Sequence, residues 1–493
     1  MSTDATRSVV RIVDEATFGV TPTTPAFQTL QLVTTPNMTF TPLTKTSAAL
    51  VADRNIADLI RVGIEAGGDI TMEASYKGLD PVLRPAMMSD WIRWPVRDNS
   101  ATAASNITGV DGAGVYTFLA TAGTELNDHP FVVGMLMNAT GFGVAANNQL
   151  ARVTAVSATM ATVATSSVEA SPPAYARLKA VGIQGVASDI TATAGPNTLA
   201  TTLLNFATLG IIPGMWLFVG GTASGVGFAT AANKDWVRVQ TVTATLLTLD
   251  IVPAGWTTDT GSGKTIQLFV GDVIRNGTTP RSTAVEIEYS DLSPVQYDLY
   301  NGCRWGIEFT SAPQDIMHAK ATMMGTTATN GTARFAGATT LPAPTNDVIN
   351  TSSHYGEIRV NNVLVGAGPN WVDAISIKLD NMLRRQKAIG SLYDIGIGLG
   401  QANVTGSLSF FYGDAAVRTL VLAGTALGYS NVLFDPTLQA AYHFDIPRLK
   451  FVSGTPTIPG INTDRKLVTP FQGLKHAALG YAFQLSRFDY LPL

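Results

Sequence analysis

The chain has 493 residues, too many for one hydrophobic core, and at roughly 100–200 residues per domain it should hold about three domains. Charged residues make up 14% and hydrophobic residues 46%, so the composition excludes a disordered chain. The formal net charge of -4 argues against a protein that binds nucleic acid by neutralising phosphates. Because so few charges on a long chain favour surfaces buried against other chains, we expect self-assembly.

The N-terminal region predicts an extended arm followed by a projecting loop. Prolines at positions 22 and 25 keep the arm extended, and residues 29–33 form a predicted strand. Residues 41–55 fit neither the helical nor the strand period for long. We therefore expect a long projecting loop there.

Residues 61–76 predict a β-hairpin, because from position 69 polar and apolar residues alternate as in a half-buried antiparallel strand. A turn and an N-cap at Asp80 should then begin a short amphipathic helix over residues 81–88, with proline near its start. The polar side of the hairpin carries Asp69, Thr71, Glu73 and Ser75, and the apolar side carries Ile70, Met72, Ala74 and Tyr76.

The same unit recurs near the C-terminus, at residues 395–418. With a shift of 334 positions (404 minus 70) and no gap, Thr71 aligns with Thr405 and Asp80 aligns with Asp414. The polar face, the apolar face and the helix start all coincide. The sequence therefore predicts an internal repeat, which we interpret as a duplicated domain.

A second, different repeat lies between residues 101 and 277. Residues 131–137 are similar to residues 211–217, and residues 152–156 are similar to residues 238–242. Each unit has the short strands and Gly or Asn turns of a small β-sandwich or barrel. We predict an insertion of two small β-domains on an accessible outer surface, since an inserted domain must leave and re-enter its parent at adjacent points.

Strands at residues 284–289 and 305–309 should complete the first copy, by analogy with residues 442–446 and 481–485 in the second. Residues 331–350, rich in Thr, Pro and Ala, form the predicted linker. The predicted limits are residues 1–100 and 278–340 for the first copy with its linker, 101–277 for the insertion, and 341–493 for the second copy.

Sequence signatures of catalysis fail on inspection. Residues 257–265 end like a phosphate-binding loop, but Thr258 stands where its first glycine is needed, and a strand rather than a helix follows. The five histidines have no metal-ligand spacing, and no G-x-S-x-G elbow is present. The carboxylate pair Glu65 and Glu73 has its ordinary cause in strand alternation. We expect no enzyme, cofactor or metal, and the single cysteine, Cys303, should be a buried small hydrophobe.

Three segments carry a resemblance to a known family: residues 15–22, residues 52–54, and residues 67–76. The chain resembles the tail tube (major tail) proteins of long, non-contractile-tailed bacteriophages of the siphovirus type. The resemblance implies duplicated β-sandwich or barrel domains, each with a flanking short helix, besides the inserted pair of small β-domains. It also implies rings of six domains that stack into a tube through which DNA passes without specific binding.

The resemblance further implies partners and a location. The partners are other copies of the chain, the tape measure protein, and the tail terminator and tip proteins, with no membrane. The protein would be made in the host cytoplasm, since its start lacks an export signal, and would end in the virion tail. Two tube domains per chain favour a trimeric ring with pseudo-sixfold symmetry, and a true hexamer is the alternative. A carbohydrate-binding adhesin is the rival class, with Trp216, Trp236 and Trp256 as stacking platforms.

Two sets of residues are candidates for function. A duct for DNA should lack Lys and Arg, because each one that neutralises a phosphate adds affinity through counterion release. We therefore predict a lumen lined by Glu65, Asp69, Glu73, Asn403, Thr405 and Ser407. Polar loops without a core role suit docking between rings, and the candidates there are Lys45, Asp53, Arg54, Arg384 and Arg385.

Overall fold

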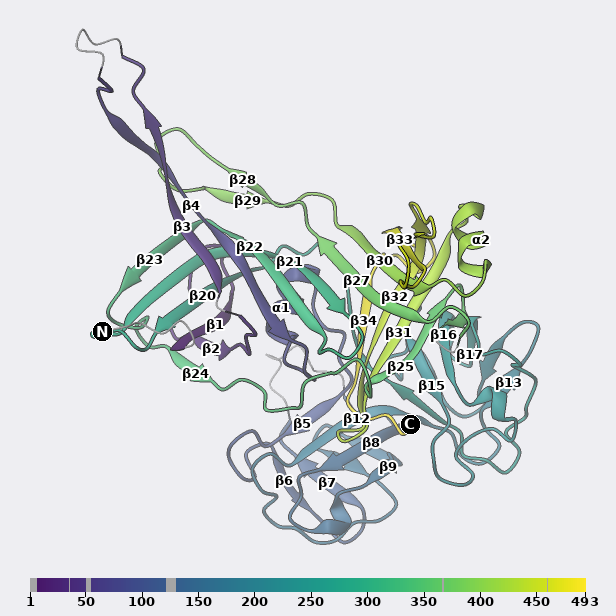
Figure 1. Ribbon diagram of the computed structural model, residues 1–493. Helices are drawn as coiled ribbons and strands as arrows, with labels where there is room; N and C mark the ends of the chain where they lie inside the picture. Colours follow the sequence, from purple (N-terminus) through teal and green to yellow (C-terminus); the bar gives the residue numbers. More distant parts are fainter. Residues whose placement is uncertain (1–6, 35, 50–54, 121–129, 366–367, 459) are drawn as a thin grey trace.

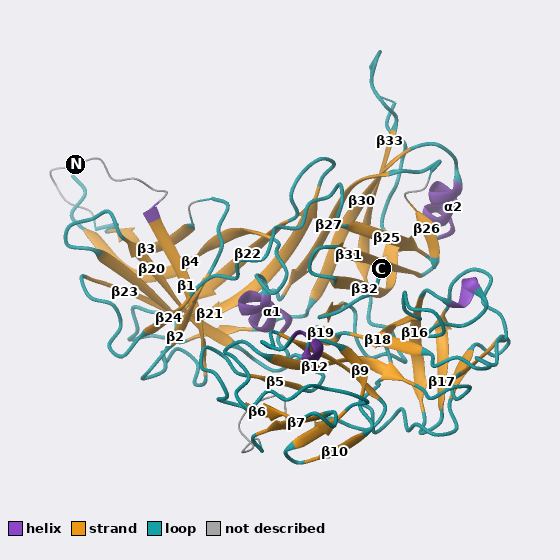
Figure 2. Cartoon of the chain, turned by 90° about the horizontal axis from the view of Figure 1, so that it is seen from below, coloured by secondary structure: helices purple, strands orange, loops and turns teal. Residues whose placement is uncertain are grey.

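The computed structural model describes residues 7–34, 36–49, 55–120, 130–365, 368–458 and 460–493 (Figure 1). Strands dominate this part of the chain, and it contains two α-helices. Figure 2 shows these helices at separate places beside the sheets. The protein is mainly β, as the sequence predicted.

Nine elements make up the first repeat. Their antiparallel pairing gives the strand order β3–β4–β22–β21–β20–β1–β2, and β23 also pairs with β21. The elements are β1 (Ser8–Glu15), β2 (Ala26–Thr29), β3 (Asn37–Thr46), β4 (Leu59–Glu73), α1 (Asp80–Met87), β20 (Ser282–Tyr289), β21 (Gln296–Ser311), β22 (His318–Gly325) and β23 (Thr327–Gly331).

The second repeat has nine elements in the same chain order. Its strand order is β27–β30–β33–β32–β31–β25–β26, with β34 paired to β32 as β23 is to β21. The duplication is therefore confirmed. The elements are β25 (Tyr355–Val360), β26 (Val363–Val365), β27 (Val372–Asp380), β30 (Asn403–Phe411), α2 (Ala416–Ala423), β31 (Leu427–Asp435), β32 (Ala440–Phe451), β33 (Lys466–Gly473) and β34 (Gln484–Phe488).

The predicted hairpin at residues 61–76 is wrong. Residues Leu59–Glu73 form one continuous strand, β4, which pairs with β3 along one edge and with β22 along the other. Gly67 and Gly68 do not turn the chain. A Cβ atom on Gly68, whose φ is +149°, would lie 2.1 Å from the carbonyl oxygen of Asn37, so glycine is needed for the close approach of β3.

The alignment of the two copies also needs correction. A Cβ atom on Gly406 would lie 2.1 Å from the carbonyl oxygen of Ser376 in β27, which matches the surroundings of Gly68 against Asn37. Gly68 therefore aligns with Gly406, a shift of 338 (406 minus 68) instead of 334. Because side chains alternate with a period of two, an error of four positions leaves every residue on its predicted face.

The C-terminal half of the predicted alignment is wrong as well. The counterpart of β20 is β31, and the counterpart of β21 is β32, so residues 442–446 match β21 and residues 481–485 lie at the start of β34. A register shift between Thr283 and Val285 recurs between Leu427 and Tyr429, which fixes this assignment. The predicted linker contains β24 (Thr339–Leu341), which pairs in parallel with β2.

Both short helices exist, but neither begins as predicted. Leu79 is the N-cap of α1, and Asp80 instead contacts Arg487. The N-cap of α2 is Ala415, while Asp414 Oδ1 accepts a hydrogen bond of 2.8 Å from the backbone N–H of Ala416. Asp80 therefore forms a long-range ion pair with Arg487 instead of capping the helix.

A strand pair joins the two repeats directly. Ile307 to Ser311 of β21 pair antiparallel with Leu379 to Ile375 of β27. The connection from β27 to β30 contains β28 (Arg384–Gln386) and β29 (Gly396–Gly398) and runs beside the long β3–β4 pair (Figure 1). One hydrophobic core runs through both repeats, and it includes Ile70 and Leu408.

The insertion consists of two units with the same strand order. The first is β6–β7–β11–β10 with β9–β8–β12, and the second is β13–β14–β17–β16–β15–β18, where the single long strand β16 corresponds to β9 and β10. Pairing of β12 with β18 joins the units. The strands are β6 (Ile107–Val110), β7 (Val115–Phe118), β8 (Met135–Thr140), β9 (Leu150–Arg152), β10 (Ala155–Ser157), β11 (Met160–Thr162), β12 (Arg177–Gln184), β13 (Thr191–Thr193), β14 (Thr198–Ala200), β15 (Trp216–Val219), β16 (Trp236–Val242), β17 (Leu246–Ile251) and β18 (Gln267–Val270).

The chain enters and leaves the insertion at adjacent points. The backbone N–H of Trp94 donates to Asp272 Oδ1 at 2.8 Å, and Ile92 forms a bridge with Val273. On the entry side, β5 (Val96–Asp98) pairs with β12 inside the insertion. On the exit side, β19 (Asp272–Arg275) pairs with β34 of the second repeat.

Candidate functional site

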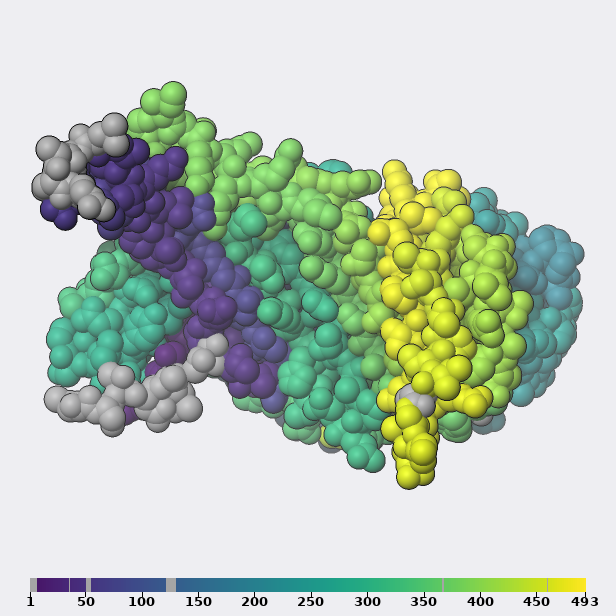
Figure 3. Space-filling view, turned by 45° about the horizontal axis from the view of Figure 1, so that its top comes forward, coloured from purple at the N-terminus to yellow at the C-terminus, as the bar shows by residue number. Residues whose placement is uncertain are grey.

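One face of the joined sheet is open and polar. It spans β3, β4, β22, β21, β27, β30 and β33, and Figure 3 looks onto it, where the colour passes from purple through teal and green to yellow. In β4, Ile70 and Met72 point into the core and are each 1% exposed. Asp69, Thr71 and Glu73 alternate with them on the open side and are partly exposed.

The structure brings most of the predicted lumen residues together on this face. Asp69 and Glu73 lie on β4, and Asn403, Thr405 and Ser407 alternate with the buried Val404 and Leu408 on β30. The two groups belong to equivalent strands of the two repeats, separated by β22, β21 and β27.

The face also carries lysines, which the sequence analysis missed. Lys320 on β22 lies 3.4 Å from Asp69, and Lys378 on β27 lies 3.6 Å from Asp380. Both lysine side chains are about half exposed, so each pair lies in solvent. Lys320 and Thr322 alternate in the sequence with Ala319, Ala321 and Met323. This alternation could have predicted that Lys320 lies on the polar face. The face is thus a mixture of paired charges and neutral polar groups, and it carries lysine as well as carboxylates and hydroxyls.

Glu65 is held by the second repeat instead of facing open space. Lys387 Nζ donates to Glu65, and Arg385 Nε lies 3.7 Å from it. The hydrogen bond from Lys387 lowers the pKa of Glu65, as do the charges of Arg385 and Lys387, against the opposing effect of burial. The β27–β30 connection therefore covers this end of β4.

The residues predicted for docking between rings lie in different surroundings. Lys45 is exposed on β3, and Arg384 is exposed on β28 with one guanidinium N–H donating to the carbonyl of Leu399 at 3.1 Å. Arg385 makes its contacts within the chain: it donates hydrogen bonds to Asp394 at 2.5 Å and to the carbonyl of Ala66 at 2.6 Å. Asp53 and Arg54 lie outside the described residues.

The three tryptophans proposed for carbohydrate stacking are buried. Trp216 and Trp236 are each 1% exposed and Trp256 is 9% exposed. The ring of His443 on β32 lies between two of them, 4.3 Å from Trp216 and 5.0 Å from Trp236. Trp216 and Trp236 pack the insertion against the second repeat, and Trp256 packs within the insertion, so none of the three presents an open face to a sugar.

Buried charges also hold the insertion in place. Asp489 contacts Lys77 at 2.7 Å, Arg177 at 3.0 Å and Lys179 at 3.7 Å. Burial alone would raise the pKa of Asp489, but the cations Arg177, Lys77, Lys179 and Arg487 hold it well below its ordinary value. Burial lowers the pKa of Lys77 to about 8. Because Lys77 follows β4 and Arg177 lies in the insertion, this cluster ties the two together.

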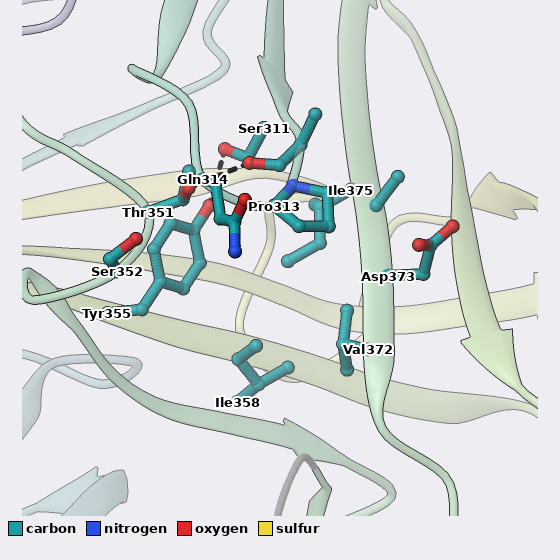
Figure 4. Close-up of a pocket in the computed structure, with 12 residues that line it drawn as sticks. Ser311, Pro313, Gln314, Thr351, Ser352, Tyr355, Ile358, Val372, Asp373 and Ile375 are labelled. Atoms are coloured by element: carbon teal, nitrogen blue, oxygen red, sulfur yellow. Dashed lines mark hydrogen bonds between the residues drawn. The ribbon is translucent and has the colours of Figure 1, made fainter.

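A cavity of about 280 Å³ lies at the seam between the repeats (Figure 4). The end of β21 meets β25 and β27 there, and Tyr355 donates a hydrogen bond of 2.6 Å to Ser311 Oγ. The carboxylate of Asp373 accepts bonds from Lys466 at 2.9 Å and Ser409 at 3.1 Å. Asp373, the one charged side chain among the lining residues, is thus already paired. The cavity therefore lies between the two repeats without an unpaired charged group in its lining.

Metal-ligating side chains are not clustered in the part of the chain that the structure describes. There, no three His, Cys, Asp or Glu side chains come together to hold a metal ion. The same residues contain no helix both long and apolar enough to cross a bilayer. Cys303 is fully buried, and burial raises the pKa of its thiol well above the ordinary value.

A duplicated sheet with an open polar face and direct strand pairing between the repeats defines a protein built from two joined, equivalent β-domains. A family model described as phage tail tube protein matches residues 5–212 and 217–473, and the chain belongs to this family. It is therefore a structural component of the phage tail. No curated protein matches the chain.

Proposed function

We propose that copies of this chain close into rings and that the rings stack into the tail tube through which the genome is delivered. The observation that supports this most is the pairing of β21 with β27. It joins two equivalent domains side by side through their sheets, which is the arrangement of neighbours in a ring.

Three chains per ring follow from the duplication. Each chain supplies two domains, so three chains supply six positions with pseudo-sixfold symmetry. The alternative is a ring of six chains, in which both repeats act as one larger domain. The ring symmetry separates these two arrangements.

The open polar face is the proposed lumen, with Asp69, Glu73, Asn403, Thr405 and Ser407 in contact with the passing strand. Pairing of Lys320 with Asp69, and of Lys378 with Asp380, neutralises the lysines locally. A surface without net positive charge gains little from counterion release, so DNA can slide over it.

The insertion is proposed to decorate the outside of the tube. Trp216 and Trp236 pack around His443 in the first half of β32, whereas the second half of β32 pairs with β33, a strand of the open face. We propose that the insertion begins and ends at the contact between Trp94 and Asp272. These two residues lie near the limits of 101 and 277 expected from the sequence.

The projecting β3–β4 pair, with Lys45 near its end, and the exposed Arg384 are proposed to dock between rings. The tape measure, tail terminator and tip proteins are the proposed partners inside the tube and at its ends. Synthesis in the host cytoplasm precedes assembly.

The test is electron microscopy of the expressed protein with symmetry analysis and native mass spectrometry. Rings of three chains are the expected result. Six chains per ring would contradict the trimer, and a protein that remains monomeric at high concentration would contradict the tube.

A further inference from the structure

The first strand of each repeat has a different environment. β27 is flanked on both sides, by β30 and by β21, whereas β3, its counterpart, pairs with β4 alone among the described strands. The free edge of β3 is long and largely exposed, and Phe40 within it is 39% exposed. An unpaired edge of this kind is a template for another strand.

β21 covers the edge of β27, and the counterpart of β21 in the second repeat is β32. The extended chain continues beyond the end of β32. Pro456 forms a bridge with Leu467, as its counterpart Phe309 pairs with Ala319. The backbone N–H of Thr457 donates to the carbonyl of Lys466 at 2.9 Å. Residues 454–458 thus occupy the place that residues 307–311 hold in the first repeat, and within the described chain β33 alone pairs with the segment 452–458.

Resting on the ring proposed above, we infer that residues 452–458 of one chain pair antiparallel with β3 of a second copy. The pairing repeats the β21–β27 joint at the boundary between chains. In that joint Glu308 lies opposite Lys378, and the same register places Thr455 opposite Thr39 of the next chain.

Exposed apolar side chains support this partner. Val452 is 71% exposed and Ile458 is 86% exposed. They lie at the two ends of the segment whose counterpart, the end of β21, is covered by β27 in the first repeat. Burial of such side chains against the neighbour provides the driving force for association.

Prolines fit the same arrangement. A proline in a ladder is tolerated where its missing N–H faces away from the partner, so Pro42 directs its nitrogen to the free edge of β3. Backbone groups of alternate residues point to the same side, which places the N–H of Phe40 there as well. The edge can therefore accept a specific partner, while Pro42 and Pro456 restrict pairing with others.

Cysteine cross-linking tests this register. Thr39→Cys with Thr455→Cys should give covalently joined two-chain and three-chain species when assembled rings are oxidised or treated with a short bifunctional reagent. Cys303 is buried and should not react. Glu308→Cys with Lys378→Cys is the matched control, because it links the same joint within one chain. Thr39→Cys with the distant Thr437→Cys should link nothing.

Rings that form normally without a link between positions 39 and 455 would overturn this interface and leave the ring proposal intact. Failure of the unmodified chain to form rings would overturn both. As a second test, Phe40→Pro removes the N–H at the free edge and should abolish ring formation in a folded chain. Phe40→Thr keeps that N–H, and rings should survive; loss of rings in both variants to the same extent would contradict pairing through the backbone.

Discussion

The guanidinium of Arg385 bridges the two repeats, since its Nε lies 3.7 Å from Glu65 of the first repeat and its Nη1 bonds Asp394 of the second at 2.5 Å. The side chain of Asp394 is 1% exposed, and Arg385 is the cation paired with it. The sequence had assigned Glu65 to the lumen and Arg385 to the contact between rings. Their meeting shows that the β27–β30 connection is anchored on its own chain.

We predict that Arg385→Ala releases this connection from β4. Loss of the arginine leaves Asp394 buried without a cation, which costs about 3–5 kcal/mol when a buried pair is broken. Limited proteolysis should show faster cleavage within residues 386–400, and urea denaturation should show lower stability. Arg384→Ala is the control, because Arg384 is exposed, and similar cleavage of both variants would contradict the anchoring role.

Replacing Asp489 by asparagine should loosen the insertion. The change removes the carboxylate shared by Lys77, Arg177 and Lys179, and an unpaired buried charge costs about 3–5 kcal/mol. The measurement is the free energy of unfolding in urea. Asp380→Asn, which breaks the exposed pair with Lys378, should cost only ~0–1 kcal/mol. Equal effects of the two substitutions would refute the importance of burial.

Acid should weaken the packing of the insertion through His443. Burial, together with Arg238 and Arg359, holds the pKa of His443 well below its ordinary value, so the folded state resists protonation. The unfolded chain binds that proton below pH 6.5, so stability is lost as the pH falls from there, by at most about 1.4 kcal/mol per pH unit.

His443→Phe should reduce this loss between pH 6.5 and pH 5, as measured by urea denaturation at each pH. Asp445 and Glu357, whose pKa values are raised by burial, act in the opposite direction, so the difference between variants is the measure. His476 is only partly buried and its pKa is also lowered by burial, so His476→Gln is the comparison and should reduce the loss less than His443→Phe does. Identical pH slopes for the unmodified protein and His443→Phe would contradict the assignment.

Lysine at Asp69 and Glu73 should slow genome ejection without preventing assembly. The double change adds unpaired positive charge to the proposed lumen, repeated in every ring, and the effect should grow at low salt. Glu65 stays unchanged because it binds the second repeat. Virions carrying Asp98→Lys on the insertion are the control, and ejection at the normal rate from the double variant would remove these residues from the lumen.

Deletion of residues 96–271 behind a short Gly/Ser linker should leave ring formation intact. This deletion keeps β19, which pairs with β34, whereas deletion of residues 101–277 would remove it. The change uncovers Val432 and Phe488, so both should be replaced by threonine to keep the protein soluble. A folded, soluble deletion variant that forms no rings would contradict a decorative insertion.

Period-two alternation in the sequence predicted a mainly β fold and the faces on which residues 69–73 of β4 and 403–408 of β30 lie, and the matching turn and helix start predicted the duplicated domain. Adjacent side chains on a strand point to opposite faces, so the pattern of Ile70, Met72 and Asp69 carries that information locally. The insertion with its own repeat was also visible, because both units keep similar strands and turns.

Register and partnership required the tertiary structure. Shifts of 334 and 338 give the same alternation, and only the close approach of Asn37 to Gly68 and of Ser376 to Gly406 separates them. Lys320 of β22 and Lys378 of β27 lie on the polar face because their strands pair with β4 and β21. Glu65 contacts Arg385 because the β27–β30 connection of the second repeat runs back beside β4. Such contacts depend on where distant segments meet in space, which local periodicity does not encode.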